Sequence, residues 1–288
     1  MTSYIRSVSL FALTALLLSP SAYATTLILV DGEGFESPSY SSAFSGTGQL
    51  EGQFASTFGG LGSTAWARVG TGGTANVQSS VVFSGSQALE VNRDANADER
   101  WAVPLAGVPT LPFVVIDWAM RVESSSLSGG SGFGPFFGIE AYGNTGGIIR
   151  HGSLGVDANT QELLFTNAAF GLVPTAGGET VNFGEWNNFR LVFDFPNNEY
   201  RGFLNGSLLF VTAFEFGPSS SFIDADIAAI GASGDANSQA ATGTAYFDNY
   251  SVFETDDASV LIPEPTAALT LLVGAVTLAM GRRRKNCR

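Results

Sequence analysis

The chain has 288 residues, 45% of them hydrophobic, and its 26 acids against 13 Lys and Arg give a formal charge of −13. That length suits one large domain, and the acid excess excludes nucleic acid and anionic lipid as plausible ligands, because like charges repel. The only cysteine, Cys287, is the penultimate residue. The sequence therefore excludes a disulfide, and it leaves no thiol nucleophile or thiolate metal site in the main body of the chain.

The N-terminus has the three parts of a secretory signal peptide. Arg6 supplies the positive charge, Val8 to Leu18 form the apolar segment, and Ala22-Tyr23-Ala24 is an A-x-A cleavage site. We expect signal peptidase to remove residues 1–24. The alternative is an uncleaved N-terminal anchor.

Between the two ends, short apolar segments alternate with Gly, Ser and Asn, which predicts many strands and no amphipathic helix. Apolar residues occupy the odd positions of 189–195, the signature of a half-buried strand. Asn205-Gly206 predicts a tight hairpin turn, because both residues tolerate positive φ. The expected strands are Thr26–Val30, Val77–Phe83, Ala88–Arg93, Arg100–Pro104, Phe113–Val122, Phe136–Tyr142, Ile148–Val156, Glu162–Thr166, Asn188–Phe195, Tyr200–Leu204, Leu208–Phe214, Asp226–Gly231 and Thr244–Phe253.

This pattern predicts an all-β fold, a two-sheet antiparallel sandwich over residues 25–253. Residues 36–75 are rich in Ser, Gly and Thr, which favours a long irregular loop, and the acidic segment 254–262 is expected to be a linker. Three pieces, residues 77–89, 186–206 and 245–252, together resemble the concanavalin A-like or laminin-G-like jelly roll. The resemblance spans about 77–253 and implies that the sandwich is a jelly roll.

The C-terminal segment 263–288 combines a turn, an apolar helix and a basic end. Thr266 to Met280 are 15 residues, about 23 Å of helix against a bilayer core of about 30 Å. The prolines keep the outer side extended, and the basic residues hold the C-terminal end in the cytoplasm. The residues that define the segment are Pro263, Glu264, Pro265, Arg282, Arg283, Arg284 and Lys285.

These parts, in this order, resemble the PEP-CTERM sorting signal of Gram-negative bacteria. The resemblance implies transient membrane anchoring, processing by an exosortase, and an association with exopolysaccharide and biofilm. The protein is then expected at the cell surface or in the extracellular matrix. An ordinary tail anchor is the alternative. Six of the 13 cationic residues lie in the two end segments, so the exported body has 7 cations, all Arg, against 26 acids, a formal charge of −19.

Catalytic residues are not apparent in the sequence. The only histidine, His151, lies on an expected strand, which disfavours a Ser-His-Asp site. The E-x-D-x-x-E spacing of laminarinase-like jelly rolls is absent, since Glu254-Thr255-Asp256 is followed by Ser259 at the third position. The sequence therefore predicts that the protein is not an enzyme.

Ligand sites are expected to be weak. Calcium is the ion that suits an acidic, cysteine-free exterior protein, and the residues considered for it are Asp94, Asn96, Asp98 and Glu99. A second, weaker group is Asp224, Asp226, Asp235 and Asn237. No other cofactor is expected. A sugar would need an exposed aromatic face, and the candidates are Trp66, in the loop 36–75, and Tyr142.

The leading functional interpretation from the sequence is a structural or adhesive protein of the exopolysaccharide matrix. The first alternative is a carbohydrate-binding, lectin-like module. The second is a glycan-active hydrolase or lyase, which would have to use carboxylates that no motif marks.

Overall fold

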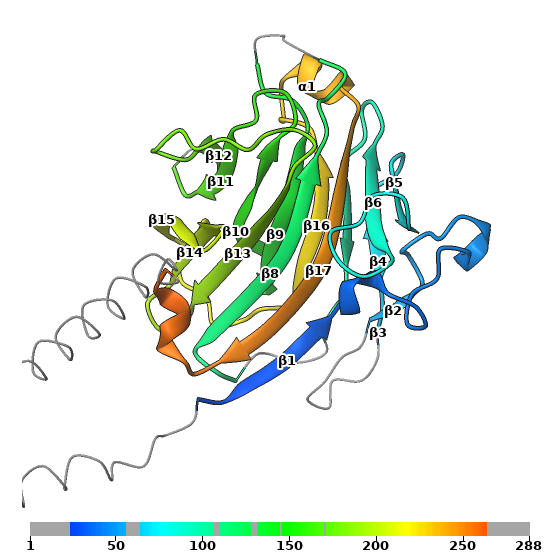
Figure 1. The fold of residues 1–288 in the computed structure, drawn as a ribbon. Helices are drawn as coiled ribbons and strands as arrows, with labels where there is room; N and C mark the ends of the chain where they lie inside the picture. The colour runs from blue at the N-terminus through cyan, green and yellow to red at the C-terminus, as the bar shows by residue number, and fades with distance from the viewer. Residues whose placement is uncertain are drawn as a thin grey trace, which may run out of the picture.

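The computed structural model describes residues 24–55, 64–105, 110–127, 132–144, 146–169 and 171–263. They form a sandwich of antiparallel sheets, one of eight strands and one of seven, with a small two-stranded sheet at one side (Figure 1). With 50% strand and 7% helix, the chain is all-β, as the sequence predicts.

The eight-stranded sheet has the order β15-β14-β13-β8-β17-β6-β5, and β1 pairs with β17 beside this path. Its strands are β1 (Thr26–Asp31), β5 (Thr74–Gln78), β6 (Ala88–Arg93), β8 (Phe113–Val122), β13 (Trp186–Asp194), β14 (Glu199–Leu204), β15 (Ser207–Ala213) and β17 (Gly243–Thr255).

The seven-stranded sheet has the order β12-β11-β10-β9-β16-β7-β4. Its strands are β4 (Ala67–Val69), β7 (Glu99–Ala102), β9 (Phe136–Asn144), β10 (Ile148–Asp157), β11 (Leu163–Asn167), β12 (Gly171–Pro174) and β16 (Asp224–Ile230). The small sheet pairs β2 (Phe54–Ala55) with β3 (Thr64–Ala65), the helix α1 is Ala236–Ala240, and the 3-10 turns are η2 (Glu33–Phe35), η3 (Phe44–Gly46) and η4 (Ala258–Leu261).

The main core lies between the two large sheets, where alternate residues of each strand meet. On β8 the inward residues include Ile116 and Trp118, and on β13 they include Phe189 and Leu191. Trp118 and Phe189 are opposite in register and stack with ring centroids 5.4 Å apart. The period of two residues seen in the sequence therefore directs apolar side chains inward and polar ones to the outer faces.

The hairpin expected at Asn205-Gly206 is present. Both residues have positive φ, 49° and 79°, and they join β14 to β15. This confirms the prediction, because a two-residue turn of this kind needs φ above zero at both central positions.

Residues 36–75 are not the irregular loop that the sequence predicts. The described part of this stretch contains η3, β2, β3, β4 and the start of β5, and it contributes Tyr40, Leu50 and Trp66 to the core. Trp66 is 1% exposed, and its Nε1 donates a hydrogen bond to the Tyr40 hydroxyl at 3.0 Å. The composition was misleading because turn-forming residues separate short strands here, and several of the apolar residues between them are buried, although Phe54 and Val69 are exposed.

The C-terminal end of the described chain also differs from the prediction. Strand β17 continues to Thr255, and η4 packs Val260 and Leu261 on Val115, Val192 and Phe203 of the eight-stranded sheet. The segment 254–262 is therefore largely folded onto the domain instead of being a free linker.

The two ends of the domain meet at this edge. Strand β1 runs antiparallel to the end of β17, so that Thr26 lies opposite Thr255. The backbone N–H of Thr25 donates to Asp256 Oδ1 at 2.6 Å. The chain therefore enters and leaves the sandwich at neighbouring points.

Residues 1–23 and 264–288 lie outside the described residues, and with them Ala22, Glu264, Pro265 and the basic C-terminal group. Ala24 and Pro263 are described and belong to neither a strand nor a helix. Across the described part of the chain, no helix combines the length and the apolar character needed to cross a membrane.

Candidate functional site

The outer face of the seven-stranded sheet carries an unusual group of charged residues at its centre. On this face Glu140 of β9 lies opposite Asp226 of β16 in register, and Tyr142 lies opposite Asp224. Opposite residues of antiparallel strands share a face and have Cβ atoms about 4.5–5.5 Å apart. Register therefore brings together residues distant in sequence, which we call the polar cluster: Arg100, Glu140, Tyr142, Arg150, Glu215, Asp224 and Asp226.

Glu140 is the centre of the polar cluster. It is fully buried, and its Oε2 accepts from Arg100 Nε at 2.5 Å and from the Tyr142 hydroxyl at 3.0 Å. Its Oε1 accepts from Arg150 Nη1. Burial lowers the pKa of both arginines, but Glu140 more than offsets this for Arg100, and Glu215 together with Glu140 does so for Arg150, so both guanidinium pKa values are raised. One buried carboxylate thus holds two cations in place.

The two arginines differ in how many of their donors are used. Arg150 donates from Nε and Nη2 to the two oxygens of Glu215, at 2.6 and 2.9 Å, in addition to its bond with Glu140. Arg100 donates from Nε to Glu140 and to the Tyr142 hydroxyl, the latter at 3.0 Å. Its Nη1 and Nη2 make no hydrogen bond with any residue in the described ranges. Arg100 therefore keeps a two-nitrogen edge available for a ligand.

Asp224 and Asp226 form a second element of the cluster. They stand two residues apart on β16 and so face the same side. Burial raises the pKa of Asp224 to about 6, and burial together with the neighbouring Asp224 raises the pKa of Asp226 well above its usual value. Each has an Oδ1 that finds no hydrogen-bond donor among the described residues. Both carboxyl groups therefore release their protons at a higher pH than an exposed aspartate does, which is a shift that favours a group that transfers protons.

A groove of about 460 Å³ adjoins the polar cluster, and Arg100 and Arg150 line it. Its floor is a small apolar cluster, separate from the main core, that includes Phe136, Leu164 and Ile230. Phe136 lies over Gly138 and Gly155, where a Cβ atom would come within 2.7 Å of its ring. The rim contains Leu172 of β12 and Phe133, which is 36% exposed. An apolar floor with polar groups at its side can hold a sugar, which has apolar C–H faces and polar edges.

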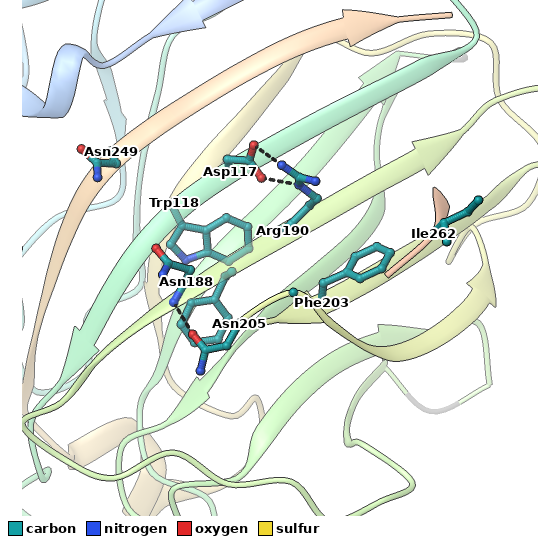
Figure 2. Close-up of a pocket in the computed structure, with 10 residues that line it drawn as sticks. Asp117, Trp118, Asn188, Arg190, Phe203, Asn205, Asn249 and Ile262 are labelled. Carbon is teal, nitrogen blue, oxygen red and sulfur yellow. Dashed lines mark hydrogen bonds and ion pairs between the residues drawn. The ribbon is translucent and has the colours of Figure 1, made fainter. Parts of the chain in front are cut away.

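The opposite outer face, on the eight-stranded sheet, has a depression of about 420 Å³ (Figure 2). Arg190 and Asp117 pair across it through two hydrogen bonds of 2.6 and 3.0 Å. The Asn188 backbone N–H donates to Asn205 Oδ1 at 2.9 Å, and Ile262 closes one end. Both members of the Asp117–Arg190 pair are about 30% exposed. The groove on the other sheet is the better candidate, because the arginines that line it are held by the fully buried Glu140.

Of the two aromatic residues that the sequence singles out, the structure places one at the site. Tyr142 belongs to the polar cluster, where burial raises the pKa of its hydroxyl. Trp66 is a core residue, so the expectation of an exposed sugar platform there is wrong. The exposed aromatic at the groove is Phe133, which sequence reasoning missed because nothing distinguishes it from other Gly-flanked residues.

The proposed calcium ligands do not converge. Asp98 accepts from Arg93 at 3.3 Å and from the Gly231 backbone at 2.7 Å, whereas Glu99 is buried and pairs with Arg68 at 3.2 Å. Asn96 has a positive φ of 59° in the turn before β7. In the described ranges, no group of three or more His, Cys, Asp or Glu side chains is arranged to hold a metal ion.

His151 is fully buried. Its ring packs on Phe193, Phe195 and Phe214, and its Nε2 lies 2.6 Å from the Ser221 carbonyl oxygen. Burial lowers its pKa, which keeps the ring neutral. His151 therefore supports β10 beside Arg150 from the inside and does not reach the groove.

A scan of protein-family models and a search of curated proteins find no match to this chain. Solved structures do align with it. One is the endo-β-1,4-glucuronan lyase of the fungus Trichoderma reesei, with 13% identity over 64% of this chain and 88% of that chain and a TM-score of 0.44. Another is a marine alginate lyase from Aplysia kurodai, with 8% identity over 62% of this chain and 86% of that chain and a TM-score of 0.45. A cellulose-induced protein aligns at 17% identity over 65% of this chain and 90% of its own, with a TM-score of 0.47.

These findings overturn two expectations from the sequence. Solved structures that align with this chain are named as polysaccharide lyases, which contradicts the interpretation as a structural or adhesive matrix protein and the prediction that the protein is not an enzyme. Identities of 8–17% and TM-scores below 0.5 do not assign an activity to this chain. The functional argument therefore has to come from the polar cluster and the groove.

Proposed function

We propose that this protein is a glycan-active jelly-roll protein that is exported to the outer face of a Gram-negative envelope and binds a polysaccharide in the groove of its seven-stranded sheet. The observation that carries this proposal is Arg100. Its guanidinium is fixed by the buried Glu140 and by Tyr142, two of its nitrogens are unused among the described residues, and the residue lines an apolar groove. Such a costly buried arrangement of charges on an outer face is explained by ligand binding better than by stability.

Export and processing stay part of this proposal. The A-x-A site and the Pro-Glu-Pro tail support removal of both end segments by signal peptidase and an exosortase. Intact-mass analysis of the protein from its native host should show a chain that starts at Thr25 and ends near residue 265. A full-length C-terminus would contradict the sorting signal and leave the groove unaffected.

Binding can be tested by electrophoresis of the full-length protein in detergent through gels that contain single polysaccharides. We expect one class of glycan to retard the protein, and Phe133→Ala together with Leu172→Ala to weaken the retardation at least several-fold. Arg121→Gln, which changes a partly exposed arginine on the other sheet, is the matched control. No retardation by neutral, carboxylated or sulfated polysaccharides would contradict the proposal.

A second candidate function is cleavage of the bound glycan. It is favoured by Asp224 and Asp226, whose pKa values are raised by burial and which stand two residues apart on the face that carries Glu140. Hydrolysis would appear as new reducing ends, and elimination as ultraviolet absorbance of an unsaturated product. Loss of either signal in Asp226→Asn, with binding retained, would assign proton transfer to this pair. Binding without turnover would leave the lectin-like function.

A further inference from the structure

The free donors of Arg100, a residue that lines the groove, suggest which class of glycan is bound. With Nε held by Glu140 and Tyr142, the guanidinium plane is fixed, and no hydrogen bond to the described residues uses Nη1 or Nη2. Two parallel N–H donors in one plane match the two oxygens of a carboxylate, whereas a single sugar hydroxyl uses one of them. We propose, as a refinement of the proposed function, that Arg100 binds the carboxylate of an acidic sugar.

The depth of the charges supports this assignment. Glu140 is fully buried beneath the arginines, while the side chains of Arg100 and Arg150 are 24% and 19% exposed. Both arginines therefore reach the surface and line the groove, whereas Glu140 does not. Because the donors are already ordered, the ligand does not have to immobilise a flexible side chain, which is a large part of the cost of binding.

A hydroxyl-binding group lies elsewhere along the same groove. The side chain of Asp98 is 43% exposed, and it uses Oδ1 to accept from Arg93 and from the Gly231 backbone. Its Oδ2 has no hydrogen bond with the described residues. A uronate residue carries a carboxylate that can bind Arg100 and hydroxyl groups that can donate hydrogen bonds to Asp98. One type of ligand can therefore use both residues.

The net charge of the exported body opposes this ligand at long range, and the carboxyl groups of the polar cluster, Asp226 among them, oppose it nearby. A formal charge of −19 repels a polyanion. At about 0.15 M salt the screening length is about 8 Å, which leaves a direct guanidinium–carboxylate contact in force and suppresses the distant repulsion. Raising the ionic strength from about 0.01 to 0.15 M should therefore strengthen the binding of a long polyuronate, the opposite of the usual effect for a cationic site.

The test compares ligands that differ only in the carboxyl group. Binding of the full-length protein is measured to a polyuronate, to the same polymer after reduction of its carboxyl groups to alcohols, and to a sulfated neutral glycan. We expect the wild type to prefer the polyuronate over its reduced form by about 10- to 100-fold, the usual strength of a hydrogen bond to a charged group. This comparison needs no variant, so it does not depend on mutant folding.

Variants then assign the preference to one residue. Arg100→Gln should remove the preference, Arg100→Lys should keep part of it because the charge stays while the planar edge is lost, and Arg121→Gln should retain it. Equal wild-type affinity for the polyuronate and its reduced form, equal affinity for the sulfated glycan, or a preference that survives Arg100→Gln would overturn the assignment. Absence of binding to all three polymers would instead contradict the proposed function itself.

Discussion

The two outer faces of the sandwich both carry an arginine–carboxylate pair, and they differ in how much water reaches it. On the eight-stranded sheet, Asp117 and Arg190 are each about 30% exposed, and the apolar part of that face is covered by the chain's own turn η4. On the seven-stranded sheet, Glu140 is fully buried under two arginines beside an open groove. The same ion-pair chemistry is therefore a surface feature on one face and a preorganised site on the other.

The largest effect expected from this comparison is loss of Glu140. Glu140→Ala leaves Arg100 and Arg150 partly buried without their shared anion, which costs about 3–5 kcal/mol of unfolding free energy. Urea denaturation of wild type and variant measures this difference. Glu140→Gln keeps the shape and should lose less. A cost below about 1 kcal/mol for the alanine variant would show that the arginines are solvated after all.

The next effect is a dependence on pH at Asp224. Its folded pKa, about 6, exceeds the ordinary value of 3.8. The stability that it contributes is therefore present at pH values below about 4 and is lost as the pH rises through 6. Asp224→Asn removes this loss, so the variant should be more stable than the wild type at pH 8 by up to about 3 kcal/mol.

Denaturation curves at intervals from pH 4 to pH 8 check this expectation. The advantage of Asp224→Asn should fade as the pH falls and vanish near pH 4. An equal difference at every pH would mean that the substitution acts through packing and that Asp224 titrates normally. Asp117→Asn on the other face serves as the control, since its carboxylate is partly exposed and paired with Arg190.

A smaller effect is expected at the turn that covers the eight-stranded sheet. Leu261 is partly buried against the cluster of Val115, Val192 and Phe203. Leu261→Ala should lower the unfolding free energy by about 1 kcal/mol, because only part of the side chain leaves an apolar contact. The neighbouring Ile262 is 66% exposed, so Ile262→Ala should change the unfolding free energy by less than about 0.5 kcal/mol. Equal losses at both positions would argue against docking of the turn.

The smallest effect is expected for the exposed ion pair. Asp117→Ala should cost about 0–1 kcal/mol and less at high salt, because solvent screens the pair. Thermal unfolding at low and high ionic strength measures it. A loss as large as that of Glu140→Ala would erase the distinction between the two faces.

Strand positions could be predicted from the sequence where one face of the strand is buried. The expected strands Ala88–Arg93 and Phe113–Val122 match β6 and β8 in full, because alternation and flanking turn residues agree there. The expected Val77–Phe83 fails, since β5 is Thr74–Gln78 and the apolar residues after it lie in a bend. Composition alone was a poor guide in 36–75, where Trp66 turned out to be buried.

The polar cluster could not be predicted, because its members are brought together by strand register. Arg100 and Glu140 are 40 residues apart, and Asp226 joins them only through the pairing of β16 with β9. One signal was available in the sequence. Glu140-Ala141-Tyr142 and Asp224-Ala225-Asp226 place acids and a tyrosine at a period of two within otherwise apolar strands. Such a pattern indicates a polar outer face but does not say which strands are neighbours.

The docking of η4 places the end of the described chain on the face of the sandwich opposite the groove. The chain leaves the domain from the outer face of the eight-stranded sheet, where Val260 and Leu261 are held against Val192 and Phe203. The groove opens on the back of the other sheet, across the full thickness of the sandwich. Pro263, where the described chain ends, and the groove therefore belong to opposite faces of the sandwich. A polymer bound along the groove leaves η4 and the sheet beneath it uncovered.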